Sequence, residues 1–280
     1  MMKNILTIDV EDWYCDLPPS EWNNYESRVE SPTKKILELL KKTNNKATFF
    51  ILGHVAENNP DLVRLIKEQG HEIGSHGYWH RRITDQTPAE FEEDLLKSIK
   101  ILKKITEEDV KGYRAPQFTV NEKTSYVIDL FKKYELKYDS SIFPVKTPLY
   151  GVPSAPLHIY RLCSKNILKD NPEEKFIEVP LSVYKIPFTK IRMPLIGGIY
   201  FRLFPYFLTK HAIKRINKQN KPAIFFTHPW EFDPNKPKIP GLKWNHYYGL
   251  KKSEMKFRKL LKEHEFISIK EWLEKNENTK

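Results

Sequence analysis

The sequence lacks several features that would remove it from the ordinary globular proteins. Its 280 residues include only two cysteines, Cys15 and Cys163, and no CxxC motif, which excludes a disulfide-stapled fold. No apolar stretch approaches the roughly 20 residues that span a bilayer. Asp9, Glu11 and Asp12 interrupt the start of the chain before the apolar region of a signal peptide can form. With 40% hydrophobic residues the chain can build a large core, and we expect it in the cytoplasm.

The net charge of +11 comes from the last third of the chain, where residues 185–280 carry 21 basic and 8 acidic side chains. One interpretation is a solvated lysine-rich surface. The other is peripheral contact with an anionic membrane face or an anionic glycan carrier through residues 185–216, where basic and aromatic side chains are interleaved. No nucleic-acid-binding motif accompanies the charge, so we expect no nucleic-acid partner.

Short β-rich runs alternate with amphipathic helices, a pattern typical of βα units around a parallel sheet. We expect strands at 4–10, 47–52, 72–75, 110–114, 177–183 and 223–227. We expect helices from Ser31-Pro32 onward and at 60–69, 87–104, 121–134, 205–219, 253–264 and 268–275. Residues 142–205 are rich in proline and irregular, which is typical of binding loops or a lid. The prediction is one α/β domain over 1–280, with C-terminal helices at about 250–275.

Acidic residues follow the first predicted strand in the run Asp9-Val10-Glu11-Asp12-Trp13. Parallel α/β folds place their active sites at the carboxyl ends of the strands. This run is therefore a candidate site, although a turn decorated with acids would have the same appearance.

Two histidines follow the third predicted strand. His76 and His80 are four residues apart, so a helical turn or tight loop can present both imidazoles to one divalent metal. With one carboxylate from residues 9–12 they would form a three-ligand set that leaves positions open for water and substrate, the catalytic pattern. The alternative is a coincidental pair of structural histidines.

Two further motifs also end predicted strands. Arg114, beside Pro116, could hold a carboxylate by a bidentate contact, or it could be a surface arginine in a turn. His228 ends the strand 223–227 and could act as a general acid near neutral pH, or it could be structural.

In chain order, these four motifs resemble those of the polysaccharide deacetylases (NodB-homology, carbohydrate esterase family 4), and the resemblance covers nearly the whole chain. It is closest to the exopolysaccharide-associated branch whose first motif reads D-V-E-D-W and whose last reads H-P-W-E. The resemblance implies a distorted (β/α) barrel of the NodB type, often seven-stranded. It also implies hydrolytic removal of N-acetyl groups from amino sugars of a polysaccharide or glycan precursor.

The resemblance implies a role for each matched residue. Asp9 is the catalytic base, His76 and His80 are metal ligands, and Arg114, accompanied by Pro116, orients the base. His228 is the general acid, Asp139 is the carboxylate that tunes this acid, and the N–H of Gln117 is an oxyanion donor. The implied cofactor is a divalent metal, with zinc expected and cobalt, manganese, iron or nickel as alternatives. Related amide hydrolases on this fold can lack a metal.

The first motif departs from the family pattern, because Val10 stands where the usual metal-binding aspartate would be. The third ligand is then Glu11 or Asp12. On an extended strand Glu11 would point to the same side as Asp9, whereas a turn beginning at Val10 would favour Asp12. We favour Asp12, since the shorter carboxylate is the family's usual ligand. In the last motif, His228-Pro229 replaces the more common His-Asp, so the surroundings of the acid differ.

Several aromatic residues are candidates for stacking against sugar rings, namely Trp13, Trp79, Tyr150, Tyr200 and Trp230. Two rival functions remain: a cyclic-amide hydrolase of the allantoinase or imidase type on the same fold, and a catalytically inactive glycan-binding protein. A homo-oligomer is expected by the same resemblance, because cytoplasmic relatives often assemble.

Overall fold

The computed structural model describes residues 2–147 and 150–277, so two positions of the irregular region, 148 and 149, lie outside the described residues. The chain folds into two compact units. Within the described residues, the first unit comprises the chain up to Phe49, Asn58–Glu72 and everything from Leu195, and the second comprises Phe50–Glu57 and Ile73–Pro194. The chain passes between the units at four points: within β2 (Thr48–Ile51), within α2 (Gly53–Asn58), within β3 (Glu72–Ser75), and between Pro194 and Leu195. The expected single domain stays a prediction.

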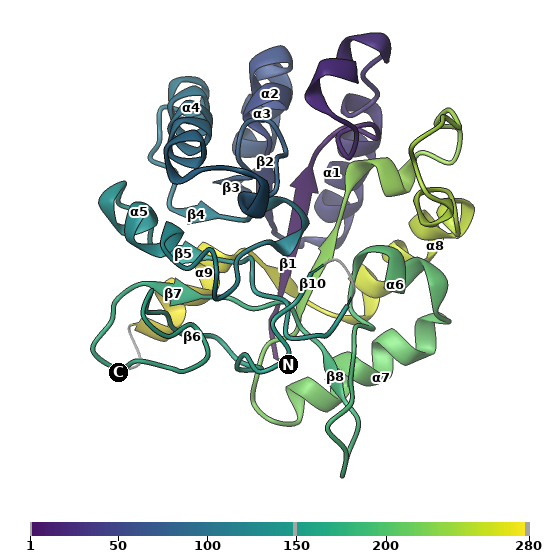
Figure 1. The fold of residues 1–280 in the computed structure, drawn as a ribbon. Helices are drawn as coiled ribbons and strands as arrows, with labels where there is room; N and C mark the ends of the chain where they lie inside the picture. Colours follow the sequence, from purple (N-terminus) through teal and green to yellow (C-terminus); the bar gives the residue numbers. More distant parts are fainter. Residues whose placement is uncertain (1, 148–149, 278–280) are drawn as a thin grey trace. The chain divides into compact units, whose positions relative to one another are not determined.

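The first unit is built on three parallel strands. β1 (Asn4–Val10) pairs with β10 (Ile224–Thr227) on one side and with β11 (Phe266–Ile267) on the other. Figure 1 shows β1 and β10 as neighbouring arrows running in the same direction. Every residue of β1 is buried, as expected of a parallel strand covered on both faces. Because Ile8 is aligned with Thr227, the next residues along the two chain segments, Asp9 near the end of β1 and His228 directly after β10, lie at one edge.

Helices pack around these strands and contribute their apolar faces to the core. They are α1 (Glu30–Thr43), α3 (Pro60–Glu68), α6 (Gly198–Leu203), α7 (Tyr206–Asn217), α8 (Leu250–Glu263) and α9 (Ile269–Glu277). A 3-10 turn, η4 (Pro229–Phe232), contacts both α1 and α8 and buries all four of its residues. The segment directly after His228 is therefore held by helices from both ends of the chain.

The second unit continues with parallel strands. β3 pairs with β4 (Gly112–Tyr113), β4 with β5 (Tyr138–Asp139) and β5 with β7 (Ile177–Glu178), while β6 (Tyr160–Arg161) is antiparallel to β7. The helices α4 (Pro88–Thr106) and α5 (Val127–Lys133) belong to this unit. Thr87 caps α4 with the capping box expected from Glu90. The predicted α/β class with parallel strands is confirmed.

Most predicted elements are present, with differences at their ends. The strand expected at 177–183 stops at Glu178, because Pro180 has no N–H to continue the ladder. The helix expected from 121 begins at Val127, since Asn121 and Thr124 form a turn in which the Thr124 hydroxyl accepts the Asn121 N–H. The irregular region also contains an unexpected hairpin of β8 (Tyr184–Lys185) and β9 (Arg192–Met193), and α6 was not expected. Among the described residues no helix is long and apolar enough to cross a membrane.

Candidate active site

His228 lies against two carboxylates of β1 and its continuation in the first unit. Its Nε2 atom is 3.8 Å from Oδ2 of Asp9 and 3.9 Å from Oε1 of Glu11. Both carboxylates are almost fully buried. Asp9 and Glu11 are two positions apart, so extended backbone directs both side chains to the same side. The first unit therefore brings the predicted base and the predicted acid together.

The opposite nitrogen of His228 is held by Glu231. Oε1 of Glu231 lies 2.7 Å from Nδ1 and also accepts the backbone N–H of His228 at 3.1 Å. Burial alone would lower the pKa of His228, but Glu11, Glu231 and Asp9 raise it to about 9. At neutral pH the ring is therefore an imidazolium, with its Nε2–H on the side of Asp9 and Glu11.

A buried arginine fixes Glu231 in turn. Nε of Arg202 donates to Oε2 of Glu231 at 2.5 Å, and both side chains are at most 2% exposed. Burial would raise the pKa of Glu231, but Arg202 and His228 lower it to about 2. Lys256 holds the end of α6, which carries Arg202, by donating to the carbonyls of Phe201, Arg202 and Phe204. Sequence reasoning missed Glu231 and Arg202 as supporting residues, although Glu231 is the last residue of the H-P-W-E motif.

Trp230 links the acid to the carboxylates. Its indole stacks on His228 with centroids 5.1 Å apart, and its Nε1–H donates to Oε1 of Glu11 at 2.9 Å. His246 stacks on the indole at 4.9 Å. Trp230 is thus packed among these neighbours and positions the carboxylate and the acid. Trp13 is also enclosed, packing edge-on against Tyr14 and Tyr25.

Asp12 has a different environment from Glu11. Its two oxygens accept the N–H of Arg28 at 3.1 Å each, one of them accepts the N–H of Trp13 at 3.0 Å, and the other accepts the hydroxyl of Ser27. Burial raises the pKa of Asp12 and these hydrogen bonds oppose the rise. Asp12 thereby fastens the loop at 26–28 to the end of β1.

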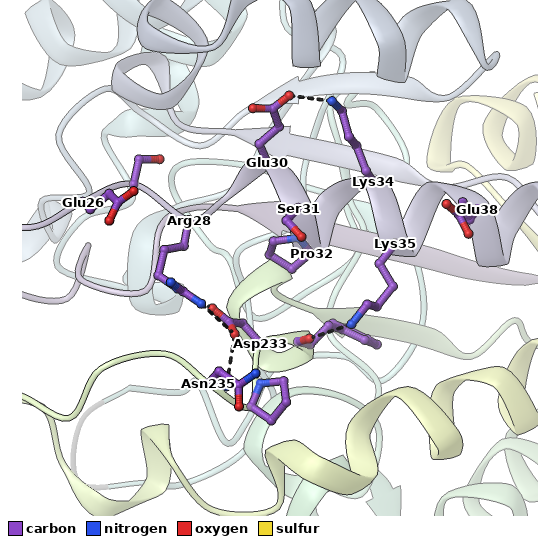
Figure 2. Close-up of a pocket in the computed structure, with 13 residues that line it drawn as sticks. Glu26, Arg28, Glu30, Ser31, Pro32, Lys34, Lys35, Glu38, Asp233 and Asn235 are labelled. Carbon is purple, nitrogen blue, oxygen red and sulfur yellow. Dashed lines mark hydrogen bonds and ion pairs between the residues drawn. The ribbon is translucent and has the colours of Figure 1, made fainter.

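The same loop borders a polar hollow of about 890 Å³ in the first unit (Figure 2). The guanidinium of Arg28 points at Asp233, with Nε 2.6 Å from Oδ2 and Nη2 3.2 Å from Oδ1. Lys34 pairs with Glu30 across one turn of α1. The charges of Arg28 and Lys34 are thus compensated by neighbouring carboxylates. The pair of Arg28 and Asp233 ties the loop that holds Asp12 to the segment after His228.

In the second unit, the predicted histidine pair lies in a tight loop after β3. The ring centroids of His76 and His80 are 5.3 Å apart, and both side chains are buried. Nδ1 of His76 donates to the carbonyl of Arg114 at 2.7 Å. Because Nδ1 carries the proton, Nε2 retains the lone pair that a metal requires. Histidines that bind metals commonly donate their other ring N–H to a backbone carbonyl, which fixes the orientation of the ring.

Asp94 of α4 holds this loop in shape. Its carboxylate accepts the N–H of Tyr78 at 2.7 Å and that of Trp79 at 3.0 Å. Gly77 has a φ of +73°, and a Cβ built there would lie 2.8 Å from Oδ2 of Asp94. Sequence reasoning did not identify Asp94, since no motif marks it on the helix.

Arg114 is fully buried beside a pair of carboxyl groups. It donates to the carbonyl and hydroxyl of Ser140 at 2.8 and 2.7 Å. Asp139 and Glu178 are partners across β5 and β7. Burial raises the pKa of Asp139 to about 6, and burial with the neighbouring Asp139 raises that of Glu178 well above its usual range. The pair therefore holds a proton near neutral pH. Gln117, which follows Pro116, has a φ of +52°.

The units divide the predicted site residues between them. The first contains Asp9, Glu11, Asp12, Trp13, Tyr200, His228 and Trp230, and the second contains His76, Trp79, His80, Arg114, Pro116, Gln117, Asp139 and Tyr150. The second unit brings His76, His80 and Arg114 together. Trp79, Tyr150 and Tyr200 are half-buried, whereas Trp13 and Trp230 are buried, so the first three are the better candidates for sugar stacking.

The comparisons with known proteins match both parts of the chain. Residues 19–138 match the family described as Polysaccharide deacetylase, and residues 140–274 match a domain of unknown function, DUF3473. A peptidoglycan deacetylase of Helicobacter pylori is 35% identical over 108 residues, which cover 39% of this chain and 36% of that protein. A peptidoglycan-N-acetylglucosamine deacetylase of Bacillus cereus is 41% identical over 86 residues, 31% of this chain and 29% of that protein. The chain thus spans about a third of the length of these curated relatives.

Solved structures share the fold over almost the whole chain. A Mycobacterium smegmatis protein assigned to the polysaccharide deacetylases aligns with a TM-score of 0.60 at 18% identity, covering 94% of this chain and 85% of that one. A carbohydrate esterase family 4 pseudoenzyme of Bacillus anthracis aligns with a TM-score of 0.50 at 17% identity, covering 96% and 65%. The predicted NodB-type fold is confirmed. The chain is therefore similar to the polysaccharide deacetylases over residues 19–138 and to the DUF3473 domain over residues 140–274.

Proposed function

We propose that the chain is a metal-dependent hydrolase that removes N-acetyl groups from amino sugars of a polysaccharide or glycan precursor. The observation that carries this proposal is the pair formed by buried Asp9 and protonated, half-buried His228, whose Oδ2 and Nε2 atoms are 3.8 Å apart. A carboxylate beside an imidazolium provides a base and an acid for one hydrolytic step. The relatives named as peptidoglycan deacetylases support the same class of substrate.

For the metal we propose His76, His80 and Glu11 as the ligands, a donor set of two imidazoles and one carboxylate. The tautomer of His76 supports this assignment. So does the clamp on Asp12, because both of its oxygens already accept hydrogen bonds from residues 13, 27 and 28. This choice differs from the expectation that favoured Asp12. The chemistry that a divalent cation supplies when bound is Lewis-acid catalysis, which polarises an amide carbonyl and makes water a nucleophile near neutral pH.

The protein groups then have separate tasks. Asp9 accepts a proton from the attacking water, and Arg114 is proposed to orient it. The N–H of Gln117, a residue with left-handed backbone geometry, is proposed to stabilise the oxyanion. His228 donates its Nε2 proton to the departing amine, so the amide and one water become acetate and a free amino sugar. We propose that Glu231 keeps His228 protonated, and the role expected for Asp139 toward this acid stays a prediction.

The proposal is tested by measuring acetate released from N-acetylglucosamine oligomers by the purified protein. Release should stop with a chelator and return with zinc, cobalt or manganese. The His228→Ala variant should bind metal normally but release at least about 100-fold less acetate, the usual contribution of a general acid. Metal binding without release from any acetylated glycan would favour the inactive glycan-binding protein, and turnover of small ureides or imides instead would favour the cyclic-amide hydrolase.

Membrane contact, the cytoplasmic location, an exopolysaccharide pathway, homo-oligomers and the absence of nucleic acid stay predictions. One structural feature supports the first of these. The turn between β8 and β9 exposes Phe188 completely and Ile191 by 57%, with Lys190 between them in the sequence. Apolar side chains flanked by a cation are typical of residues that enter a headgroup layer. Sedimentation with anionic vesicles should weaken for Phe188→Asp and remain for Phe207→Asp if this turn makes the contact.

A further inference from the structure

A cavity of about 660 Å³ in the first unit has a strongly basic lining. It lies where Pro234–Lys238, Tyr247–Gly249 and the first turn of α8 meet. No acidic side chain occurs among its described lining residues, whereas six cations do: Arg202, Lys236, Lys238, Lys251, Lys252 and Lys256. Two of these six are already occupied, because Arg202 pairs with Glu231 and Lys256 donates to three carbonyls. The other four have no acidic partner in the described part of the chain.

Lys236 is the unusual member of the group. The residue is only 5% exposed, and its Nζ atom has no hydrogen-bond partner among the described residues. Its neighbours are ring faces, with Nζ 3.9 Å from the centroid of Trp230 and 5.3 Å from that of Tyr247. Burial and the charge of Arg202 together lower the pKa of Lys236 to about 7, against the opposing charges of Glu231, Asp16 and Asp233. A buried ammonium with an open donor requires an acceptor that the described residues do not supply.

The first turn of α8 provides a second feature of the same kind. The initial N–H groups of an α-helix have no intrahelical acceptor, and the helix dipole makes this end favourable for a negative charge. Gly249 precedes the helix with a φ of +75° and offers no capping side chain. No acidic residue lies in the first turn, and Lys251 and Lys252 occupy it instead. This arrangement repels cations and attracts an anion from solution.

We propose that this cavity binds a phosphate-class oxyanion, with the ammonium of Lys236 and the start of α8 as its principal contacts and Lys238, Lys251 and Lys252 around it. The positive charge of four uncompensated cations and a helix N-terminus exceeds the single negative charge of a carboxylate, so this lining suits a diphosphate. The indole of Trp230 contacts both Lys236 and His228. Resting on the proposed function, we infer that the glycan substrate carries a phosphoryl group near its N-acetylated sugar.

The test is a calorimetric titration of the whole protein with inorganic pyrophosphate, compared with acetate at equal ionic strength. We expect saturable binding of pyrophosphate and none of acetate. Lys236→Met should weaken binding at least tenfold, and the Lys251→Ala, Lys252→Ala double variant should do the same from the protein surface. Lys262→Ala is the matched control, because it removes an exposed lysine at the other end of α8 and should leave binding unchanged. Equal binding by the Lys236 and Lys262 variants, or no binding at all, would overturn the proposal.

Two further ligands distinguish the source of the phosphoryl group. A nucleoside diphosphate N-acetylglucosamine and a polyprenyl diphosphate N-acetylglucosamine in detergent should compete with pyrophosphate to different extents. The stronger competitor identifies the carrier of the phosphoryl group. Pyrophosphate binding that depends on Lys236 without acetate release from any substrate would support the anion site and remove the proposed function. Acetate release without such binding would overturn the anion site and leave the proposed function intact.

Discussion

Glu231 accepts a hydrogen bond from Nδ1 of His228 at 2.7 Å, three residues along the chain. This carboxylate follows the strand end that delivers His228, so a single short turn supplies both the acid and the group that keeps it protonated. Arg202 pairs with Oε2 of Glu231, and its positive charge allows the carboxylate to stay ionised although it is buried. Proton donation by His228, the proposed acid, would therefore depend on a row of three side chains within the first unit.

Glu231→Gln should lower the pKa of His228 from about 9 towards the usual value near 6.5. A hydrogen bond to a charged group contributes about 1.5–3 kcal/mol, or roughly one to two pKa units. Since His228 must be protonated to act as an acid, the alkaline limb of kcat/KM should move to lower pH by about that amount. Glu265→Gln, an exposed change in the same unit, should leave the limb in place. If the alkaline limb does not move in Glu231→Gln, another carboxylate determines the pKa of His228.

The same pair should make folding stability depend on pH. The folded-state pKa of His228 is raised, so its stabilising contribution is complete below about 6.5, the unfolded value, and disappears as pH rises through about 9. Urea unfolding at pH 6, 7.5 and 9 should show a falling free energy of unfolding. The slope should be shallower in His228→Gln, and equal slopes would argue that other groups cause the loss.

Arg202→Met should destabilise the protein by about 3–5 kcal/mol, because it leaves the charge of Glu231 buried and partly unpaired. Adding Glu231→Gln removes that charge, so the double variant should recover much of the loss. Urea unfolding of the two single variants and the double variant gives the coupling energy. Additive losses would mean that Arg202 stabilises the fold through packing and its bond to the carbonyl of Tyr248 alone.

The strand-end residues could be predicted from the sequence because each motif adjoins a hydrophobic run. β1 and β10 are continuous apolar segments, so Asp9 and His228 were recognisable as residues at carboxyl ends of strands. The spacing of His76 and His80 identified them as a pair in the same way. These signals are local, and local patterns are what a single sequence retains.

The supporting residues could not be predicted, because their roles arise from contacts between distant segments. Arg202 and Glu231 are 29 positions apart, and α6 lies in a region without helical periodicity. Asp94 occupies an ordinary position on α4, and only the folded loop reveals its two backbone partners. Trp230 resembles a sugar-binding residue in the sequence, whereas in the structure it is packed between two imidazoles.

Neutralising each of the two candidate carboxylate ligands, Glu11 and Asp12, should have different effects on metal affinity and stability. Glu11→Gln should weaken metal affinity by more than the roughly 10–100-fold that changes around metal ligands cause. Asp12→Asn should bind metal normally but lose about 1–3 kcal/mol of stability, because its amide matches the donors of residues 13, 27 and 28 less well. Metal content by elemental analysis and urea unfolding measure the two effects. The reverse result would identify Asp12 as the ligand.

Gly77→Ala should impair the histidine loop, whereas Gly70→Ala should not. Both glycines have a φ of +73°, so each substitution costs about 1 kcal/mol or more of backbone strain. At Gly77 the added methyl also meets Oδ2 of Asp94 at 2.8 Å, which would displace the carboxylate from the N–H groups of Tyr78 and Trp79. At Gly70 it meets only the end of the Lys46 side chain, at 3.1 Å, and no group that shapes the histidine loop. Both variants should therefore unfold earlier, but only Gly77→Ala should lose metal affinity. Equal affinities in the two variants would show that Asp94 does not shape the loop for metal binding.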